Sequence, residues 1–512
     1  MPNWPPALIC RSFLAILLVV MGPLAQAEQP SQARLPTLGD GGDMSAGAER
    51  RLGDGIAREL YRDPDYIDDP QLTEYVQDMW QALIAAARAR GEISAELDER
   101  FAFELFLGRD RMVNAFALPG GYLGVNLGLV GVVSTPDELA SVLAHELSHI
   151  SQRHIARLIG RQKVQTPLMI GAMVLGILAA SKNPEAGQAL AIGGQALAVQ
   201  TQLNFSRDME READRVGLGL MAPAGFAPQG FVSMFDKLQQ ANRINDNGSW
   251  PYLRSHPLTT QRIADMQARQ PQGARTVPRD RGEFSLLAHA LLAARARVLS
   301  APGVDVLRQW TDEPAGLGFA ERPVAERGAA LYAAALAASE LHESARARQW
   351  LARLQPLVAA DAAASRQARL LGADIELRAG APAAALAALP VSTGSALRPE
   401  VLLRAQALLA LGRAGEASGP LQSWVALHPQ DATAWQALAS NWQAQGQVLR
   451  AVRAEGEARA AQYDYAAAVD RFKAGQALAA QSGTPADYVE VSIIDTRLRA
   501  VQSLLREQTA ER

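Results

Sequence analysis

The C-terminal half of the chain repeats itself with a period of 34 residues. Gly412 and Gly446 are 34 residues apart, and so are Ala417 and Ala451. The stretch "ALLALGRAGEA" aligns with "LASNWQAQGQVLRA", and Gly380 marks a more degenerate earlier unit. Each unit has the pattern of a helix, a turn and a second helix. Because a unit of this size cannot bury its apolar face alone, the units must stack on their neighbours.

A helical pair repeated at this period indicates tetratricopeptide repeats. Such repeats form an all-α solenoid whose curved groove binds peptides or partner proteins. The composition shifts toward Ala, Leu and Arg after "ARQPQGARTVPRDRGE". We therefore place a linker at 268–283 and a tetratricopeptide-repeat domain at 284–512.

The N-terminus carries an export signal. Arg11 precedes the apolar run "SFLAILLVVMGPL", and "AQAEQ" supplies an A-x-A cleavage site, which predicts a signal peptide at 1–27. An uncleaved anchor is the alternative, although the run is shorter than the ~20 residues that a membrane span needs. The only cysteine, Cys10, lies before the run, so the mature chain has no thiol. This composition suits the periplasm, and the net charge of -3 gives no case for nucleic-acid binding.

Residues 28–267 show a different pattern, with short strands among helices. "FAFELFLG" alternates apolar and polar residues as a strand does, and "NAFALPGGYLGVNLGLV" predicts a hairpin at a sheet edge. Thr135, Pro136 and Glu138 predict a helix that begins near Pro136. The apolar segment 167–180 is too short to span a membrane, and is either a buried helix or a flap that touches substrate or the membrane surface.

The helix from Pro136 carries "HELSHISQRH". His145 and His149 are four residues apart, so they share one helix face and can bind one metal ion. Glu146 lies beside them and can reach a metal-bound water, which is the arrangement of H-E-x-x-H zinc sites. His154 would lie roughly 140° away from that face on a continuous helix, so we expect it to have a structural or surface role.

A catalytic zinc needs a third protein ligand. Glu210, Glu212 and Asp214 in "SRDMEREADRVGLGLM" are the candidates. Glu210 and Asp214 share a helix face, which suits Glu210 as a ligand and Asp214 as the acceptor of an imidazole N–H; a solvated charged face is the alternative. His256, in "RSHP", is either a lone structural residue or a ligand that closes the zinc site.

The segments "NAFALPGGY", "ELASVLAHELSH", "EREAD" and "RSHP", in this order, resemble the M48 family of zinc metallopeptidases over about residues 50–270. The resemblance implies an α+β zincin-like domain, mostly helical with a small sheet, and one Zn²⁺ per chain. His145, His149 and Glu210 would be its ligands, and Glu146 the general base. Asp214 would support a ligand, and His256 would be a fourth, repressing ligand. A strand made of Asn114, Ala115, Phe116 and Ala117 would pair with an extended substrate.

The signal peptide and repeats narrow the resemblance to periplasmic M48 peptidases of Gram-negative bacteria. This implies an endopeptidase and chaperone-like factor in outer-membrane protein assembly, which degrades misassembled barrels. Its partners would be the barrel clients, the barrel assembly machinery through the repeat groove, and the outer membrane peripherally. The alternative is a mainly non-proteolytic scaffold with a latent or structural zinc. Glu146 favours the enzyme, because a structural zinc site has no use for a carboxylate that is not a ligand.

Overall fold

The computed structural model describes residues 44–161, 206–243, 250–269, 284–300, 302–389, 397–482 and 488–510. The predicted signal peptide with Cys10, the apolar segment 167–180 and nearly all of the predicted linker lie outside these residues. The first part contains, in order, α1 (Ala46–Arg62), α2 (Pro70–Ala89), α3 (Ala95–Arg100), β1 (Glu104–Gly108), β2 (Ala115–Leu118), the 3₁₀ turn η1 (Pro119–Gly121), β3 (Tyr122–Asn126), α4 (Leu127–Val132), α5 (Pro136–Ser151), α6 (His154–Arg161), α10 (Arg207–Ala224), α11 (Gln229–Arg243), α12 (Tyr252–Ser255) and α13 (Thr260–Ala268).

The three strands form a small mixed sheet in the order β1-β3-β2. β1 pairs with β3 in parallel, and β2 pairs with β3 in antiparallel. The hairpin turns at η1, where Gly120 and Gly121 have φ of 76° and 88°. A Cβ on Gly121 would lie 2.8 Å from the Cβ of Phe101, so this turn requires glycine. The predicted strand and edge hairpin are confirmed, and β2 is an edge strand.

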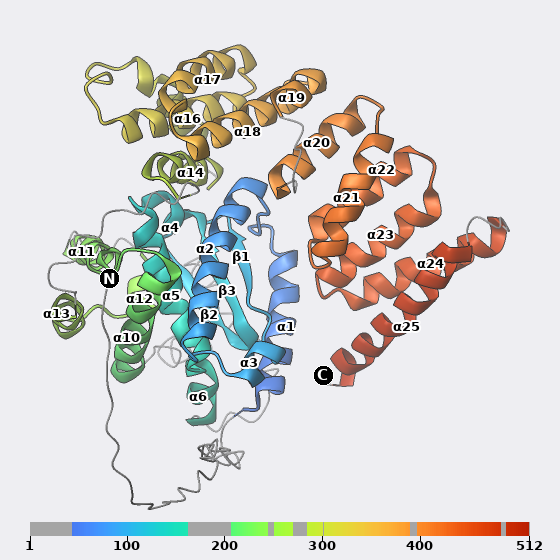
Figure 1. Ribbon diagram of the computed structural model, residues 1–512, viewed down its shortest axis with the longest axis horizontal. Coiled ribbons are helices and arrows are strands. Elements are labelled where there is room, and N and C mark those ends of the chain that lie inside the picture. Colours follow the sequence, from blue (N-terminus) through green and yellow to red (C-terminus); the bar gives the residue numbers. More distant parts are fainter. Residues whose placement is uncertain are drawn as a thin grey trace, which may run out of the picture. The chain divides into compact units, whose positions relative to one another are not determined.

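α5 is the central helix of this part of the chain and begins at Pro136, as predicted. The Thr135 side chain accepts a hydrogen bond from Glu138 N at 3.1 Å. Glu138 Oε2 accepts from Ser134 N at 2.7 Å, one residue before the partner of a standard capping box. The helix packs against β2 and β3 as well as α2, α10 and α11 (Figure 1). This enclosure buries every position from Glu138 to Ser151.

The second part is helical throughout the described residues. It contains α14 (Leu286–Leu299), α15 (Val304–Asp312), the 3₁₀ turn η2 (Glu313–Ala315), α16 (Val324–Glu340), α17 (Ser344–Val358), α18 (Ala362–Arg378), α19 (Pro382–Ala388), α20 (Arg398–Ala410), α21 (Gly415–Leu427), α22 (Ala432–Ala444), α23 (Val448–Ala461), α24 (Tyr465–Ser482) and α25 (Tyr488–Ala510). Gly380, Gly412 and Gly446, with φ near 70°, lie between the helices of three successive pairs. The mostly helical architecture with a small sheet is confirmed, and the tetratricopeptide solenoid stays a prediction.

One apolar core joins the two parts. Buried side chains of α2, such as Trp80 and Leu83, belong to the same cluster as Leu291 of α14 and Leu371 of α18. Two polar contacts reinforce this joint: Tyr75 Oη lies 2.7 Å from His289 Nδ1, and His289 Nε2 lies 3.1 Å from Val133 O. Within the described residues, no helix combines the length and the apolar character needed to cross a membrane.

Candidate metal centre

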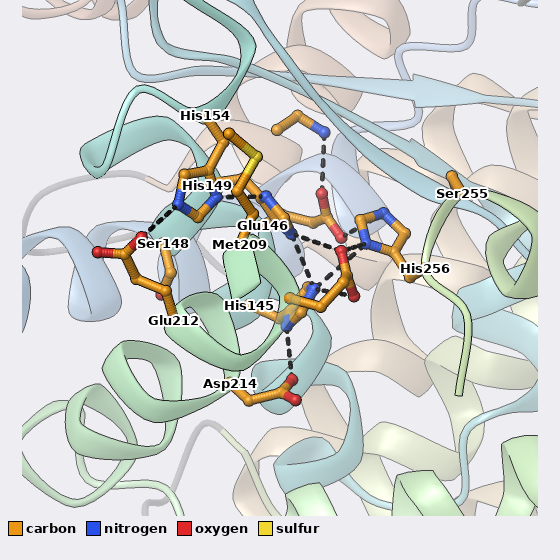
Figure 2. A network of polar contacts seen from close by, with 12 residues as sticks. His145, Glu146, Ser148, His149, His154, Met209, Glu212, Asp214, Ser255 and His256 are labelled. Atoms are coloured by element: carbon orange, nitrogen blue, oxygen red, sulfur yellow. Dashed lines mark hydrogen bonds and ion pairs between the residues drawn. The ribbon is translucent and has the colours of Figure 1, made fainter. Parts of the chain in front are cut away.

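Four side chains from three separate segments converge in one place, and Figure 2 labels the three histidines among them. His145 and His149 come from α5, Glu210 comes from α10, and His256 follows α12. Each offers one donor atom, and these atoms all lie within 4.8 Å of one another. All four residues are at most 2% exposed, so water does not screen the cluster.

The donor atoms face one another at short range. His145 Nε2 lies 3.0 Å from His149 Nε2 and 3.3 Å from His256 Nδ1. Glu210 Oε1 lies 3.0 Å from His256 Nδ1. Three imidazole nitrogens and one carboxylate oxygen form a donor set that suits a tetrahedral zinc ion. Of the predicted ligand candidates, the structure brings Glu210 into this group and leaves Glu212 and Asp214 outside it.

Two buried oxygens that have no hydrogen-bond partner also fit a metal at this position. Glu146 Oε1 and Glu210 Oε2 are buried and have no hydrogen-bond partner. Glu210 Oε2 does form an ion pair with Arg262 Nη1 at 2.7 Å, although not with hydrogen-bond geometry. A buried acceptor without a hydrogen bond costs about 1–3 kcal/mol. A divalent cation among these atoms would offset that cost, so the residues present are compatible with zinc.

Glu146 lies beside the cluster rather than in it. Its Oε2 accepts a hydrogen bond from Ala117 N of β2 at 2.9 Å, and its Oε1 lies 3.5 Å from His256 Nε2. Complete burial raises the pKa of Glu146 from its ordinary value. A carboxylate held by an edge-strand amide, with its second oxygen aimed at the cluster, has the position of a general base.

A carboxylate and an arginine fix His145 on the Nδ1 side of its ring, opposite the cluster. His145 Nδ1 lies 3.0 Å from Asp214 Oδ1, and Arg262 donates to both oxygens of Asp214 at 2.7 Å. Burial opposes a charge on His145, but contacts with Asp214 and Glu210 raise its pKa to about 9. Burial likewise opposes ionisation of Asp214, but Arg262 lowers the pKa of that carboxyl. Sequence reasoning missed Arg262, since no spacing in "RSHPLTTQRIADM" marks it as part of the site.

His154 lies on the other side of the centre, against His149. α5 ends at Ser151, Arg153 adopts φ of 52°, and α6 begins at His154. The angle predicted for a continuous helix therefore does not apply, and the His154 ring reaches back to His149. His154 is not in the group of donors. It is fully buried rather than at the surface, and burial lowers its pKa to about 4. Burial also lowers the pKa of His149.

His256 reaches the centre from a short turn. Its backbone N–H donates to Tyr252 O at 2.9 Å, and its ring stacks on the Tyr252 ring with centroids 4.6 Å apart. The predicted substrate strand is β2 with Asn114 before it. Ala115 and Ala117 of this strand are buried, and the half-buried ring of Phe116 covers Gly124.

The comparisons with known proteins agree with this geometry. Residues 70–270 match the model of peptidase family M48. The beta-barrel assembly-enhancing protease of Escherichia coli is 30% identical over 464 residues, which are 89% of this chain and 90% of that protein. A relative from Vibrio cholerae is 35% identical over 265 residues, about half of each chain. The mitochondrial metalloendopeptidase OMA1 of Saccharomyces cerevisiae is 25% identical over 237 residues, covering 45% of this chain and 66% of that protein.

Proposed function

Since the chain belongs to peptidase family M48 and is a metallopeptidase, we propose that it is a periplasmic zinc endopeptidase that assists the assembly of outer-membrane barrel proteins and degrades those that misassemble. The observation that carries the proposal is the buried group of four donors with Glu146 beside it. A structural zinc site would have no use for such a carboxylate, whereas hydrolysis requires a base.

In this proposal His145, His149 and Glu210 hold the zinc ion. When bound, zinc supplies Lewis acidity toward the scissile carbonyl and lowers the pKa of a water molecule. Glu146 takes a proton from the attacking water and then gives it to the leaving amine. Asp214 keeps His145 in the tautomer that presents Nε2, and Arg262 holds Asp214. The substrate backbone pairs with β2 along the strand from Asn114 to Ala117.

His256 acts in the proposal as a removable fourth ligand. Its nitrogen lies among the other donors, and four protein ligands would leave zinc without an open position. This closed set also supports the second candidate function, a repeat-based scaffold whose zinc is latent or structural. The two functions are compatible if His256 can leave the centre.

We also propose a domain organisation and a set of partners. Residues 1–27 would be a cleaved signal peptide and 28–267 the peptidase domain, followed by a linker at 268–283 and a tetratricopeptide-repeat domain at 284–512. The Escherichia coli relative is named for barrel assembly and is similar along most of the chain. We therefore propose barrel proteins as clients, the assembly machinery as the partner of the repeat groove, and peripheral contact with the outer membrane.

Zinc content and casein cleavage, measured side by side, test the function. The wild type should bind one zinc ion per chain. Glu146→Gln should keep the zinc and the fold but lose cleavage by about 10²–10⁴-fold, because only the base is removed. Full activity in this variant would contradict the mechanism, and a wild type without zinc would contradict the metal site.

The same assay tests the repressing ligand. His256→Ala should cleave casein faster than the wild type while zinc stays bound. His428→Ala is the control, because His428 is an exposed histidine that stacks on Trp424, outside the four-donor group. Loss of zinc or unchanged cleavage in His256→Ala would rule out the switch and leave the scaffold with a structural zinc as the better proposal.

A further inference from the structure

We propose that His154 is a positioning residue that fixes the tautomer of His149, so that the Nε2 lone pair of His149 faces the metal. The proposal rests on the proposed function, since it requires a metal held by His145, His149 and Glu210. The spacing of His149 and His154 does not predict this role, because on a continuous helix the two side chains would point about 140° apart.

A chain of short contacts runs outward from His149 (Figure 2). His149 Nδ1 lies 2.8 Å from His154 Nδ1, and His154 Nε2 lies 3.1 Å from Glu212 Oε2. Arg157 Nη1 donates to the same oxygen at 3.0 Å. The two histidines are fully buried, whereas the Glu212 side chain is 29% exposed. The chain thus connects a buried donor to a carboxylate at the surface.

These contacts allow one arrangement of protons that serves a metal. The Nε2 atom of His149 must be unprotonated to bind a metal, so its Nδ1 carries the hydrogen. That N–H needs an acceptor, which must be the unprotonated Nδ1 of a neutral His154. The hydrogen of His154 then lies on Nε2 and is donated to Glu212.

Glu212 selects this arrangement over its opposite. If His154 Nδ1 carried the hydrogen and donated it to His149, then His149 Nε2 would carry a hydrogen pointing into the cluster. In addition, the lone pair of His154 Nε2 would face the lone pairs of Glu212. An ionised carboxylate accepts hydrogen bonds and cannot donate them, so this alternative is repulsive at both ends. Arg157 keeps the carboxylate ionised and in place.

His145, the other ligand on α5, is oriented in a similar way but by a direct contact. His145 Nδ1 meets Asp214 directly, and Arg262 anchors that carboxylate. His149 reaches Glu212 and Arg157 only through the interposed ring of His154. Both ligands therefore end on a carboxylate held by an arginine. The parallel indicates that His154 does for His149 Nδ1 what the Asp214 carboxylate does for His145 Nδ1.

The test replaces the ring nitrogens while it keeps the ring. His154→Phe fills the same buried space but cannot accept from His149 Nδ1–H. We expect its zinc affinity, measured by competition with a chromogenic chelator, to fall about 10–100-fold, as for other residues that orient metal-ligating histidines. His154→Asn places an amide oxygen near the original Nδ1 and should recover most of the affinity. Nitrogen-15 NMR of labelled histidines in the zinc-free protein should show His149 losing its Nδ1–H form in His154→Phe but keeping it in His154→Asn.

A second variant decides the matter if His154→Phe does not fold. In Glu212→Gln the amide can turn either its oxygen or its nitrogen toward His154. The variant therefore no longer selects one proton arrangement of His154 and His149, while the side-chain volume hardly changes. Its zinc affinity should fall several-fold, whereas Glu376→Gln, which removes a comparable arginine-paired carboxylate far along the chain, should bind zinc as the wild type does. Wild-type zinc affinity in both His154→Phe and Glu212→Gln would overturn the positioning role of His154 but not the proposed function. A wild type that binds no zinc would overturn the proposed function together with it.

Discussion

Two clusters of charged side chains in the described residues, one fully buried and one partly buried, are built in opposite ways. One is the candidate metal centre. The other, here called the seam, consists of Arg295, Arg366 and Arg398 together with the carboxylates that they contact. Arg295 Nε lies 2.8 Å from Asp69 Oδ1, and Arg366 Nη1 lies 2.6 Å from Glu74 Oε2.

Charges in the seam are matched. Each arginine contacts one carboxylate from the first part of the chain and a second from the helices that follow, the pairs being Asp69 and Asp374, Glu74 and Glu400, and Asp68 and Asp431. In the metal centre, by contrast, imidazoles face imidazoles. Arg262 forms an ion pair with Glu210, but one oxygen of Glu146 and one of Glu210 have no hydrogen-bond partner. Complete pairing marks a structural cluster, whereas incomplete pairing in a buried place marks a site that awaits a ligand.

The strongest test of this contrast removes an arginine from the seam. Arg295→Met leaves Asp69 and Asp374 without their central partner, and an uncompensated buried charge costs about 3–5 kcal/mol. Urea unfolding should show this loss of stability, while zinc binding by the folded protein stays unchanged. Arg348→Met, which removes a surface pair with Glu376, is the control and should unfold close to the wild type. An unchanged midpoint for Arg295→Met would show that the seam is not structural.

A second test uses pH at the joint between the two parts. Burial lowers the pKa of His289 to about 4, below the ordinary value of 6.5 that the unfolded chain has. As pH falls from 6.5 to 4, His289 is protonated in the unfolded chain but stays neutral in the folded protein. The free energy of unfolding therefore decreases by about 3 kcal/mol in this window. Urea unfolding at pH 7 and pH 4.5 should show a smaller loss for His289→Gln than for the wild type. Equal losses would mean that His289 accepts a proton in the folded state.

The smallest expected effect is an increase in stability, and it concerns Glu146. Burial raises the pKa of Glu146, so its charged form destabilises the fold at neutral pH. Without zinc, Glu146→Gln should therefore be more stable than the wild type by about 1 kcal/mol, as substitutions at functional sites often are. Charge removal would thus stabilise the centre and destabilise the seam. A less stable Glu146→Gln would erase the distinction between the two clusters.

The sequence predicts those features that depend on local geometry. The spacing of His145 and His149 on a capped helix predicts their convergence, and the Pro-Gly-Gly turn predicts the hairpin. The contact of His154 was missed because α5 stops at Ser151, where Arg153 is tethered to Glu49 at 2.9 Å. That tether joins residues about a hundred positions apart, so no local pattern reveals it. Arg262 and the seam escaped prediction for the same reason, since both pair charges distant in sequence.

The clip that Glu212 makes with His154 and Arg157 has a mechanical consequence. α6 carries His154 and Arg157, α10 carries Glu212, and these contacts fasten the two helices to each other beside the centre. A displacement of α6 relative to α10 would therefore act on the Glu212 carboxylate before it reached a donor atom. Movement of α6 is consequently resisted at a partly exposed ion pair, and the spacing of the buried metal-binding atoms on α5 and α10 is preserved.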